Sequence, residues 1–207
     1  MKTTRLPGVR YWGQYQPDRH IDFNGFHWSS PAGGVLIDPM PIDDDGVAEL
    51  REAGGVAWIL VTNKEHLRAA PELKATFGAA LLAPAEERER LGEDAAHVDG
   101  WFSTTQDLPA ELQPHVDVIP LRGGKSPMEP AFYLKPLQAL YFADLVRSHV
   151  SGELRLLPDP KIQDRAQVLV SLREVAALPV QAVLLGDGDG LYRGADEALN
   201  ELLGVAP

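Results

Sequence analysis

Residues 56–61, with the sequence VAWILV, are apolar at every position. An uninterrupted apolar run of this length is the pattern of a strand that is buried on both faces. A helical stretch from Glu65 to about Phe77 follows, then a second apolar run at residues 79–83 and a short helix that opens at Pro84. This order of strand, helix, strand and helix predicts parallel strands with helices packed on the sheet.

Each half of the chain also begins with segments typical of antiparallel strands. In the first half, short apolar stretches alternate with turn residues, and the segment 31–34 (PAGG) predicts a hairpin. In the second half, strands are expected at 116–121, 131–134, 139–143 and 182–185, and helices at 162–177 and 195–203. Two mixed sheets that face each other, with helices on both outer sides, account for this pattern. The predicted fold is an α/β, four-layered αβ/βα sandwich, formed by residues 1–207 as one domain.

Composition limits the classes of function. Among 207 residues, 30 acidic and 19 basic side chains give a formal net charge of −11, which disfavours binding to a phosphate backbone. No apolar run approaches the roughly 20 residues of a spanning helix, and the N-terminus lacks the apolar core of a secretory signal. We expect a cytoplasmic protein with no nucleic-acid or membrane partner. With no cysteine, a metal site would need carboxylates and the six histidines.

Polar or glycine-rich segments directly follow four of the predicted strands. Functional sites of open α/β sheets form beyond the carboxyl ends of the strands, so these segments are the candidates. They are residues 62–68 (TNKEHLR), residues 123–127 (GGKSP), Asp144 and residues 186–188 (GDG).

In their order and spacing, these segments resemble the metallo-beta-lactamase superfamily over almost the whole chain. The stretch GGVLIDP resembles the family's strand that ends in an aspartate, here Asp38. The segment TNKEHLR stands in the place of Thr-His-x-His-x-Asp-His, and LRGGKSPMEPAFYL resembles the Gly-His-Thr-Pro-Gly segment and the next strand. LYFADLV resembles the strand that presents the bridging metal-ligand aspartate, and VLLGDG the strand that ends in Gly-His-Gly. The resemblance implies the sandwich fold and, if the protein is active, a hydrolase.

Most of the family's metal-ligand positions hold other residue types in this chain. In chain order the replacements are Asn63, Glu65, Leu67, Arg68, Lys125 and Asp187, and only Asp144 keeps the residue type of the family. None of the six histidines falls on a position where the family places a ligand. Glu65 and Asp187 could still donate oxygen ligands, and Asn63 could do so weakly.

The replacing side chains argue against a dinuclear zinc site. Arg68 stays protonated, and Lys125 would have to lose its proton before it could bind a metal. Without metal, Glu65, Asp144 and Asp187 would form a like-charge cluster that costs stability. We therefore predict that Arg68 and Lys125 replace the metals as counter-ions and that no metal cofactor is bound.

The remaining polar residues near these motifs leave alternatives open. His66 lies between two motif positions, where a surface or capping role and a catalytic or ligand role are both possible. His149 is expected on a loop near the cleft. Lys125 and Ser126 lack the spaced upstream glycine of a phosphate-binding loop, but Lys125 could meet an anion as a point charge. The catalytic candidates are Asp144, Glu65 and His66, and the candidate ligand-binding residues are Asn63, Arg68, Lys125, Ser126, Asp187 and His149.

Three functions follow. The first, favoured by Leu67, Arg68 and Lys125, is a protein that has lost the zinc site and binds a small anionic molecule or a protein partner in the remnant cleft. The second is a hydrolase in which Glu65, Asp144 and Asp187 hold one Mg, Mn or Zn ion, which would activate water against an ester or phosphoester. The third is a structural or dimerisation module, with homodimerisation left open by the sequence.

Overall fold

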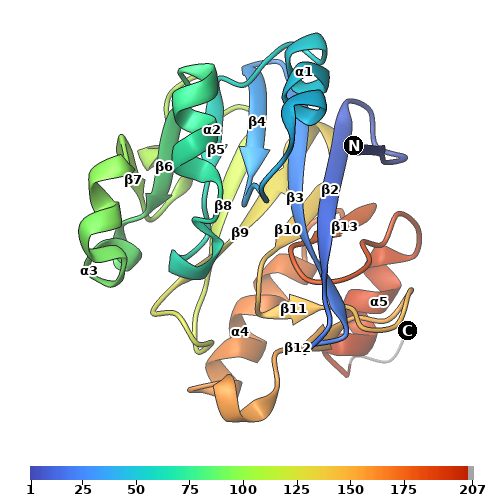
Figure 1. Ribbon diagram of the computed structural model, residues 1–207. Coiled ribbons are helices and arrows are strands. Elements are labelled where there is room, and N and C mark those ends of the chain that lie inside the picture. Colours follow the sequence, from blue (N-terminus) through green and yellow to red (C-terminus); the bar gives the residue numbers. More distant parts are fainter. Residues whose placement is uncertain (205–207) are drawn as a thin grey trace.

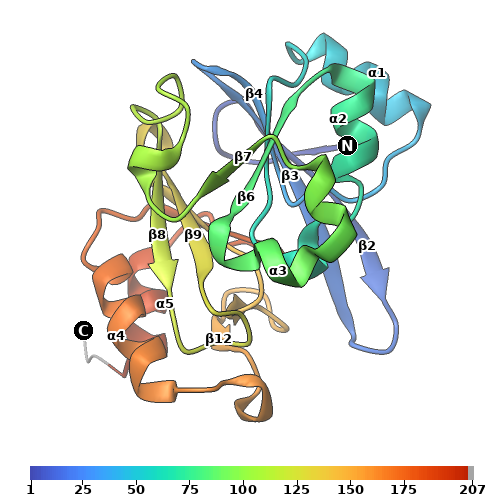
Figure 2. The ribbon, with the colours of Figure 1, turned by 90° about the vertical axis from the view of Figure 1, so that its left-hand side faces the viewer.

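The computed structural model describes residues 1–204 and contains two large sheets packed face to face (Figure 2). The seven-stranded sheet has the order β1 (Lys2–Thr3), β2 (Val9–Gln16), β3 (Ile21–Ser30), β4 (Gly33–Ile37), β5 (Trp58–Leu60), β6 (Ala80–Pro84) and β7 (Gly100–Phe102). The four-stranded sheet has the order β13 (Ala182–Leu185), β10 (Ala139–Phe142), β9 (Glu129–Leu134) and β8 (Val116–Leu121). A small hairpin pairs β11 (Val146–Arg147) with β12 (Arg155–Leu156).

Both large sheets are mixed, as the sequence predicts. Strands β1 to β4 pair antiparallel, and β4 to β7 pair parallel. In the second sheet β10 is parallel to β13 and antiparallel to β9. The parallel strands of both sheets end in the same region of the molecule, where the polar segments of the sequence are brought together (Figures 1 and 2).

Helices cover the outer face of each sheet (Figures 1 and 2). On the first sheet lie α1 (Asp44–Glu52), α2 (Ala70–Phe77) and α3 (Arg88–Leu91), and on the second lie α4 (Arg165–Ala176) and α5 (Ala195–Leu202). Between the sheets, the Phe102 and Phe132 rings meet edge to face at 5.8 Å, and Phe26 meets Tyr141 in the same way at 5.6 Å. The predicted four-layered sandwich is therefore confirmed. In the described part of the chain, no helix has the length and apolar character needed to cross a membrane.

The helix expected from Glu65 begins only at Ala70. Residues Lys64–His66 form a separate 3₁₀ turn, in which the side chain of Asn63 accepts the backbone N–H of Glu65 at 2.9 Å. Arg68 then adopts a left-handed conformation (φ 39°), which ends the turn, and a proline occupies the first turn of α2. The polar segment after β5 is thus a short rigid turn rather than the start of a helix.

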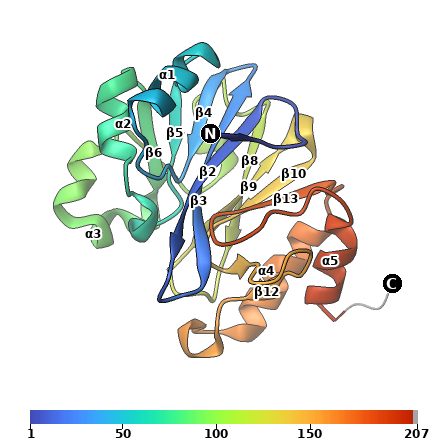
Figure 3. The same ribbon diagram turned by 45° about the vertical axis from the view of Figure 1, so that its right-hand side comes forward.

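Strand β3 and the loop after β13 join the first and last parts of the chain. The N–H of Asn24 donates to the carbonyl of Gly186, and the N–H of Gly188 donates to the carbonyl of Asp22, both at 2.8 Å. On the other side of this loop, the N–H of Ser148 donates to the carbonyl of Asp187 at 3.2 Å. The loop is therefore held between the β2–β3 hairpin and the β11–β12 hairpin (Figures 1 and 3).

Strand β7 and the pair β11–β12 were not predicted from the sequence. These strands have two or three residues each, which is too short to show an alternating pattern.

Candidate functional site

The polar segments after four strands meet between the two sheets. Asp38 follows β4 and the turn Lys64–His66 follows β5, whereas Asp144 follows β10 and Asp187 follows β13. A pocket of about 580 Å³ opens at this place, and Lys125, His66 and Asp144 form part of its lining. The pocket thus lies beyond the carboxyl ends of strands, the region where sites of open α/β sheets form.

Asp38 is the fully buried centre of the hydrogen bonds beneath the pocket. Its Oδ1 accepts the N–H of Thr62 at 2.8 Å, and its Oδ2 accepts the Thr62 hydroxyl at 2.6 Å and the Tyr141 hydroxyl at 2.7 Å. The Nδ1 atom of His66 lies 2.7 Å from the same Oδ2. Because an ionised carboxylate only accepts, Nδ1 of His66 carries a proton and Nε2 faces the site.

His66 is buried and lies between two carboxylates. Its Nε2 is 3.3 Å from Oδ2 of Asp144 and 3.5 Å from Nη2 of Arg68. Burial alone would lower the pKa of this imidazole, but the charge of Asp38 and the hydrogen bonds to Asp38 and Asp144 raise it to about 9. The side chain is therefore an imidazolium at neutral pH in the structure as it stands.

Asp144 receives three donors on one oxygen. Its Oδ2 lies 2.7 Å from Nζ of Lys125 and accepts the side-chain amide of Asn63 at 3.0 Å, in addition to the contact with His66. Burial raises the pKa of this carboxyl, yet His66 and Lys125 overcome that effect and hold the pKa well below its ordinary value. Asp144 is thus a stable anion whose charge is already matched by cations of the protein.

Asp187 is paired with Arg147, a residue that the sequence analysis did not identify. Nη2 of Arg147 lies 2.7 Å from Oδ2 of Asp187 and 3.6 Å from Oδ1 of Asp144. The approach to Asp187 lacks hydrogen-bond alignment, and neither Asp187 oxygen has a hydrogen-bond partner within residues 1–204. Burial raises the pKa of Asp187, and Arg147 opposes that rise. The sequence signal was a basic residue three positions after the retained Asp144.

Glu129 is a second residue that sequence reasoning missed. It opens β9, a strand buried at every position, and its Oε1 accepts the backbone N–H groups of Asp144 at 3.1 Å and Leu145 at 2.9 Å. Burial and the negative charge of Asp144 raise the pKa of Glu129 to about 8. The side chain therefore positions the backbone that carries Asp144. In the sequence, the only indication of this role is an acidic residue beside an apolar strand.

Glu65 does not join Asp144 and Asp187, contrary to the prediction of three converging carboxylates. Its side chain is 48% exposed at the pocket rim, with Oε2 3.8 Å from Nζ of Lys125. The reason is the 3₁₀ turn, which directs His66 inward and Glu65 outward. In the described residues, the side chains grouped closely enough to share a metal ion are His66, Asp144 and Asp187, whose donor atoms lie within 4.8 Å of one another.

Arg68 lies in the pocket lining but does not neutralise the carboxylates as predicted. Its Nη1 donates to the carbonyls of Asn24 at 3.1 Å and Asp38 at 3.4 Å, and its guanidinium lies 5.1 Å from the ring centre of Phe23. Lys125 is placed as predicted, whereas Arg147 takes the position expected for Arg68.

The last two ligand-binding candidates lie apart from the carboxylates. Ser126 is buried and accepts a hydrogen bond from Nη1 of Arg90 at 2.9 Å, so it anchors the loop that carries Lys125. Arg90 also pairs with the buried Glu87. His149 is exposed and does not line the pocket.

The side chains that could bind metal can be compared with the two-zinc centre that the motifs of the superfamily imply. One ion could be shared by His66, Asp144 and Asp187, because neutral imidazole and carboxylate are zinc ligands. A second ion would need further donors, and residues 1–204 contain no second group of this kind. Lys125 and Arg147 also occupy the space beside both carboxylates. Among residues 1–204, the structure therefore offers one group of donors, enough for a single ion.

The sequence matches the family model of the metallo-beta-lactamase superfamily over residues 1–205. The chain belongs to this superfamily. Among solved structures, it is similar to a metallo-beta-lactamase from Pontibacter korlensis, with 14% identity, a TM-score of 0.74 and coverage of 99% of this chain and 98% of that one. It is also similar to one from Erythrobacter litoralis with beta-mercaptoethanol in its active site, with 16% identity, a TM-score of 0.72 and coverage of 99% and 96%.

A third similar structure is the metallo-beta-lactamase FIM-1 from Pseudomonas aeruginosa in its mono-zinc form, with 16% identity, a TM-score of 0.70 and coverage of 100% and 96%. A comparison with curated proteins finds no match. At these identities the similar structures establish the fold of this superfamily member and leave its substrate unassigned.

Proposed function

We propose that this superfamily member binds a small anionic molecule in its cleft and that Lys125 and Arg147 take the place of the two metal ions. The observation that carries the proposal is the pair of contacts at 2.7 Å, from Lys125 to Asp144 and from Arg147 to Asp187. Both carboxylates stand at strand ends where the superfamily motifs place ligands. Each is neutralised by a side chain of the protein itself.

The balance of charges in the cleft supports this proposal. Asp38, Asp144 and Asp187 supply at most three negative charges, and three cationic side chains contact these carboxylates: Lys125, Arg147 and the protonated His66. A divalent ion would add two positive charges to a buried group that is already compensated. Uncompensated charge in a buried site is expensive, so the balance favours the metal-free form.

The mouth of the pocket carries an excess of basic side chains. Arg19, Arg68, Lys125 and Lys161 line it, against Glu65 and Asp144. Phe23 and Ile162 add apolar surface, and the volume of about 580 Å³ lies in the range of small-molecule sites. An organic anion, with a carboxylate or phosphate group and a short apolar body, matches this lining.

Metal analysis and ligand screening together test the proposal. Purified protein incubated with excess zinc and then desalted is expected to retain less than one zinc per chain. A thermal-shift screen of small carboxylates and phosphates is expected to give anions that raise the melting temperature, because a ligand of the native state stabilises it. Lys125→Met should abolish the rise, whereas Lys74→Met, in an exposed ion pair with Asp99, should preserve it. Stoichiometric zinc, or no anion effect, contradicts the proposal.

One observation favours a second candidate, a hydrolase with a single metal ion. A histidine that binds a metal usually donates its other N–H to a carboxylate, and His66 has that arrangement with Asp38. When bound by His66, Asp144 and Asp187, one ion would lower the pKa of a water molecule. Lys125, which lines the pocket, would then bind the anionic part of an ester or phosphoester. Zinc that is retained by the native protein and lost in Asp187→Asn would select this candidate.

A further inference from the structure

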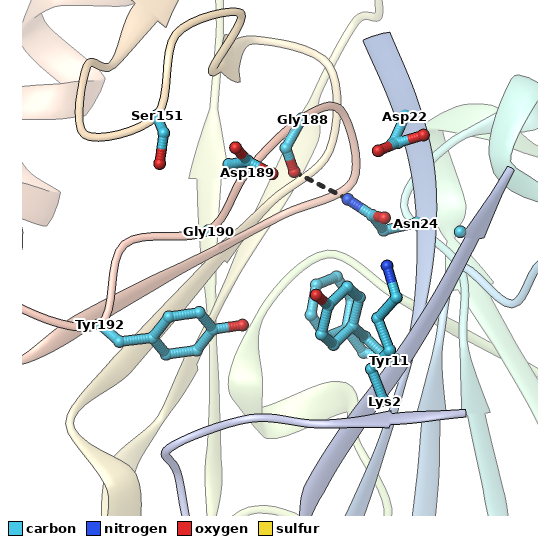
Figure 4. A pocket seen from close by; sticks show the side chains of 11 residues that line it. Lys2, Tyr11, Asp22, Asn24, Ser151, Gly188, Asp189, Gly190 and Tyr192 are labelled. Carbon is cyan, nitrogen blue, oxygen red and sulfur yellow. Dashed lines mark hydrogen bonds between the residues drawn. The ribbon is translucent and has the colours of Figure 1, made fainter. Parts of the chain in front are cut away.

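A second pocket, of about 280 Å³, lies on the other side of the loop after β13 (Figure 4). It is enclosed by β1, β2, β3 and the residues that follow Asp187. Within this loop, the buried Asp187 pairs with Arg147, whereas Asp189 lines the second pocket. None of the side chains described below takes part in the proposed anion site.

The side chain of Asn24 provides a fixed hydrogen-bond acceptor in this pocket. Asn24 is only 4% exposed, and its Nδ2 donates to the carbonyls of Leu185 at 3.0 Å and Gly188 at 2.8 Å. Because both carbonyls require a donor, the amide cannot be flipped, and Oδ1 is the atom left free. No donor in the described residues reaches Oδ1.

The residue opposite Asn24 keeps this acceptor accessible. Gly13 pairs with Asn24 across β2 and β3, and a Cβ atom at Gly13 would stand 2.4 Å from Oδ1 of Asn24. Any side chain at this position would therefore cover the oxygen. Gly13 itself lines the pocket, so the bare backbone leaves Oδ1 facing the cavity (Figure 4).

The rest of the lining combines carboxylates with aromatic rings. Asp22 and Asp189 contribute two carboxylates, and neither forms an ion pair within the part of the chain that the structure describes. Tyr11 and Tyr192 form walls with their rings and hydroxyl groups (Figure 4). A pocket with one fixed acceptor, two anions and aromatic walls suits a cation that donates several hydrogen bonds.

The ammonium group of Lys2 already occupies part of this space. Its Nζ lies 5.5 Å from the ring centre of Tyr11, and Figure 4 shows it directed toward Asn24. Lys2 belongs to β1, a strand of two residues at the edge of the sheet, and it forms no ion pair among residues 1–204. The pocket therefore accommodates a primary ammonium group, which belongs to a short edge strand.

We propose that this pocket binds a small primary amine whose ammonium group replaces that of Lys2 beside Oδ1 of Asn24, Asp22 and Asp189. Lys2 then acts as an internal competitor. Removal of the Lys2 ammonium group should therefore tighten the binding of a cation, because the competing charge is gone. A ligand held by the Lys2 charge itself, such as a carboxylate, would show the opposite effect.

Titrations of the full chain with n-butylamine and 1,4-diaminobutane, followed by NMR shifts of the tyrosine rings at constant ionic strength, test this proposal. We expect saturable binding of both amines and none of 1-butanol or butanoate. Lys2→Gln should tighten amine binding several-fold, and Asp189→Asn, at an exposed site that does not threaten folding, should weaken it at least fivefold. Lys125→Met should leave it unchanged, which separates this pocket from the anion cleft.

Three results would overturn the proposal. They are the absence of saturable amine binding even in Lys2→Gln, equal binding of 1-butanol, and weaker amine binding in Lys2→Gln than in the native chain. The first would show that the free acceptors do not select a cation. The second would show binding by the apolar walls alone. The third would show that Lys2 contributes to ligand binding instead of competing with it.

Discussion

The ammonium nitrogen of Lys125 lies 2.7 Å from Oδ2 of Asp144, and this contact joins the loop before β9 to the loop after β10 at one end of the second sheet. Asn63, from the turn after β5 in the first sheet, donates to the same oxygen at 3.0 Å. The carboxylate of Asp144 is therefore a contact point between the two halves of the sandwich. The proposed anion binding and the stability of the fold both involve this carboxylate, so substitutions of Lys125 or Asp144 should affect both.

Lys125→Met should destabilise the fold because it leaves the buried Asp144 with less compensation. We expect a loss of about 2 kcal/mol in the free energy of unfolding, in the range for a broken, largely buried ion pair. Lys74→Met, which removes the exposed pair with Asp99, should cost less than about 1 kcal/mol. Urea unfolding of both variants measures the difference.

A double-mutant cycle with Asp144→Asn separates the pair from other effects of Lys125. If Lys125 and Asp144 interact directly, the double variant should lose less stability than the sum of the single variants. Additive losses would show that the contact at 2.7 Å contributes little.

Asp38→Asn replaces one carboxylate oxygen with an amide nitrogen, and we expect it to be strongly destabilising. Thr62, His66 and Tyr141 all contact the carboxylate, and an amide group would place N–H against at least one of these donors. We expect a loss of about 3 kcal/mol, as for a buried network with one partner removed. Asparagine tolerates the left-handed conformation at this position (φ 44°), so backbone strain does not contribute.

Asp43→Asn supplies the matched control for Asp38→Asn. Asp43 caps α1 by accepting the N–H of Gly46 at 2.8 Å, and asparagine caps helices as well as aspartate does. Its melting temperature should stay within a few degrees of the native value. A similar small effect for Asp38→Asn would argue that the buried network is not essential.

The fold could be predicted because its signals are local. The runs at 56–61 and 182–185 are apolar at every position, and strands β5 and β13 form within them. The cap at Asp43 and the glycines after α1 mark a helix without reference to the rest of the chain. The left-handed residue Arg68 gives no such signal, because its conformation is fixed by contacts with the carbonyls of Asn24 and Asp38.

The candidate site could be predicted only in part, since its pairs are formed by residues far apart in the sequence. Asp144 and Lys125 stand out because each lies in a short segment that follows a strand. Arg147 pairs with Asp187 across a long stretch of intervening chain, and no local pattern reveals that contact. The motif comparison also predicts that the side chain of Glu65 points into the site. In the structure, the 3₁₀ turn directs the side chain of the next residue, His66, inward instead.

Gly188→Ala should strongly destabilise the chain. A Cβ atom at Gly188 would stand 1.8 Å from the carbonyl oxygen of Ser148, and the backbone there is left-handed (φ 93°). We expect a loss above about 3 kcal/mol from strain and from the displaced loop. Gly152→Ala is the matched control, because Gly152 has nearly the same φ of 91° with no atom within 4 Å of the added Cβ.

The difference between these two alanine variants isolates the steric clash from the cost of the backbone conformation. Thermal unfolding should show Gly152→Ala close to the native chain and Gly188→Ala far below it. Equal losses would mean that the clash with Ser148 is relieved by a small movement of the loop.

His27 should make the stability depend on pH below neutrality. It is fully buried in β3, with Nε2 3.2 Å from the carbonyl of Gly55, and burial lowers its pKa from 6.5, aided by the charge of Arg10. The unfolded chain therefore binds a proton at a higher pH than the native chain does. The contribution of neutral His27 is fully present above the unfolded pKa and is lost as the pH falls below it, with a slope of at most about 1.4 kcal/mol per pH unit.

His27→Gln removes this titration and keeps a polar side chain in β3. Urea unfolding between pH 7 and pH 5 should show the native chain losing stability relative to the variant as the pH falls, because only the native chain must bury a neutral imidazole. The stability of His149→Gln, which changes an exposed histidine, should depend on pH as that of the native chain does over the same range. If the free energy of unfolding of His27→Gln has the same pH dependence as that of the native chain, then His27 accepts its proton without unfolding. Its unpaired Nδ1 would then have found a partner in the protonated form.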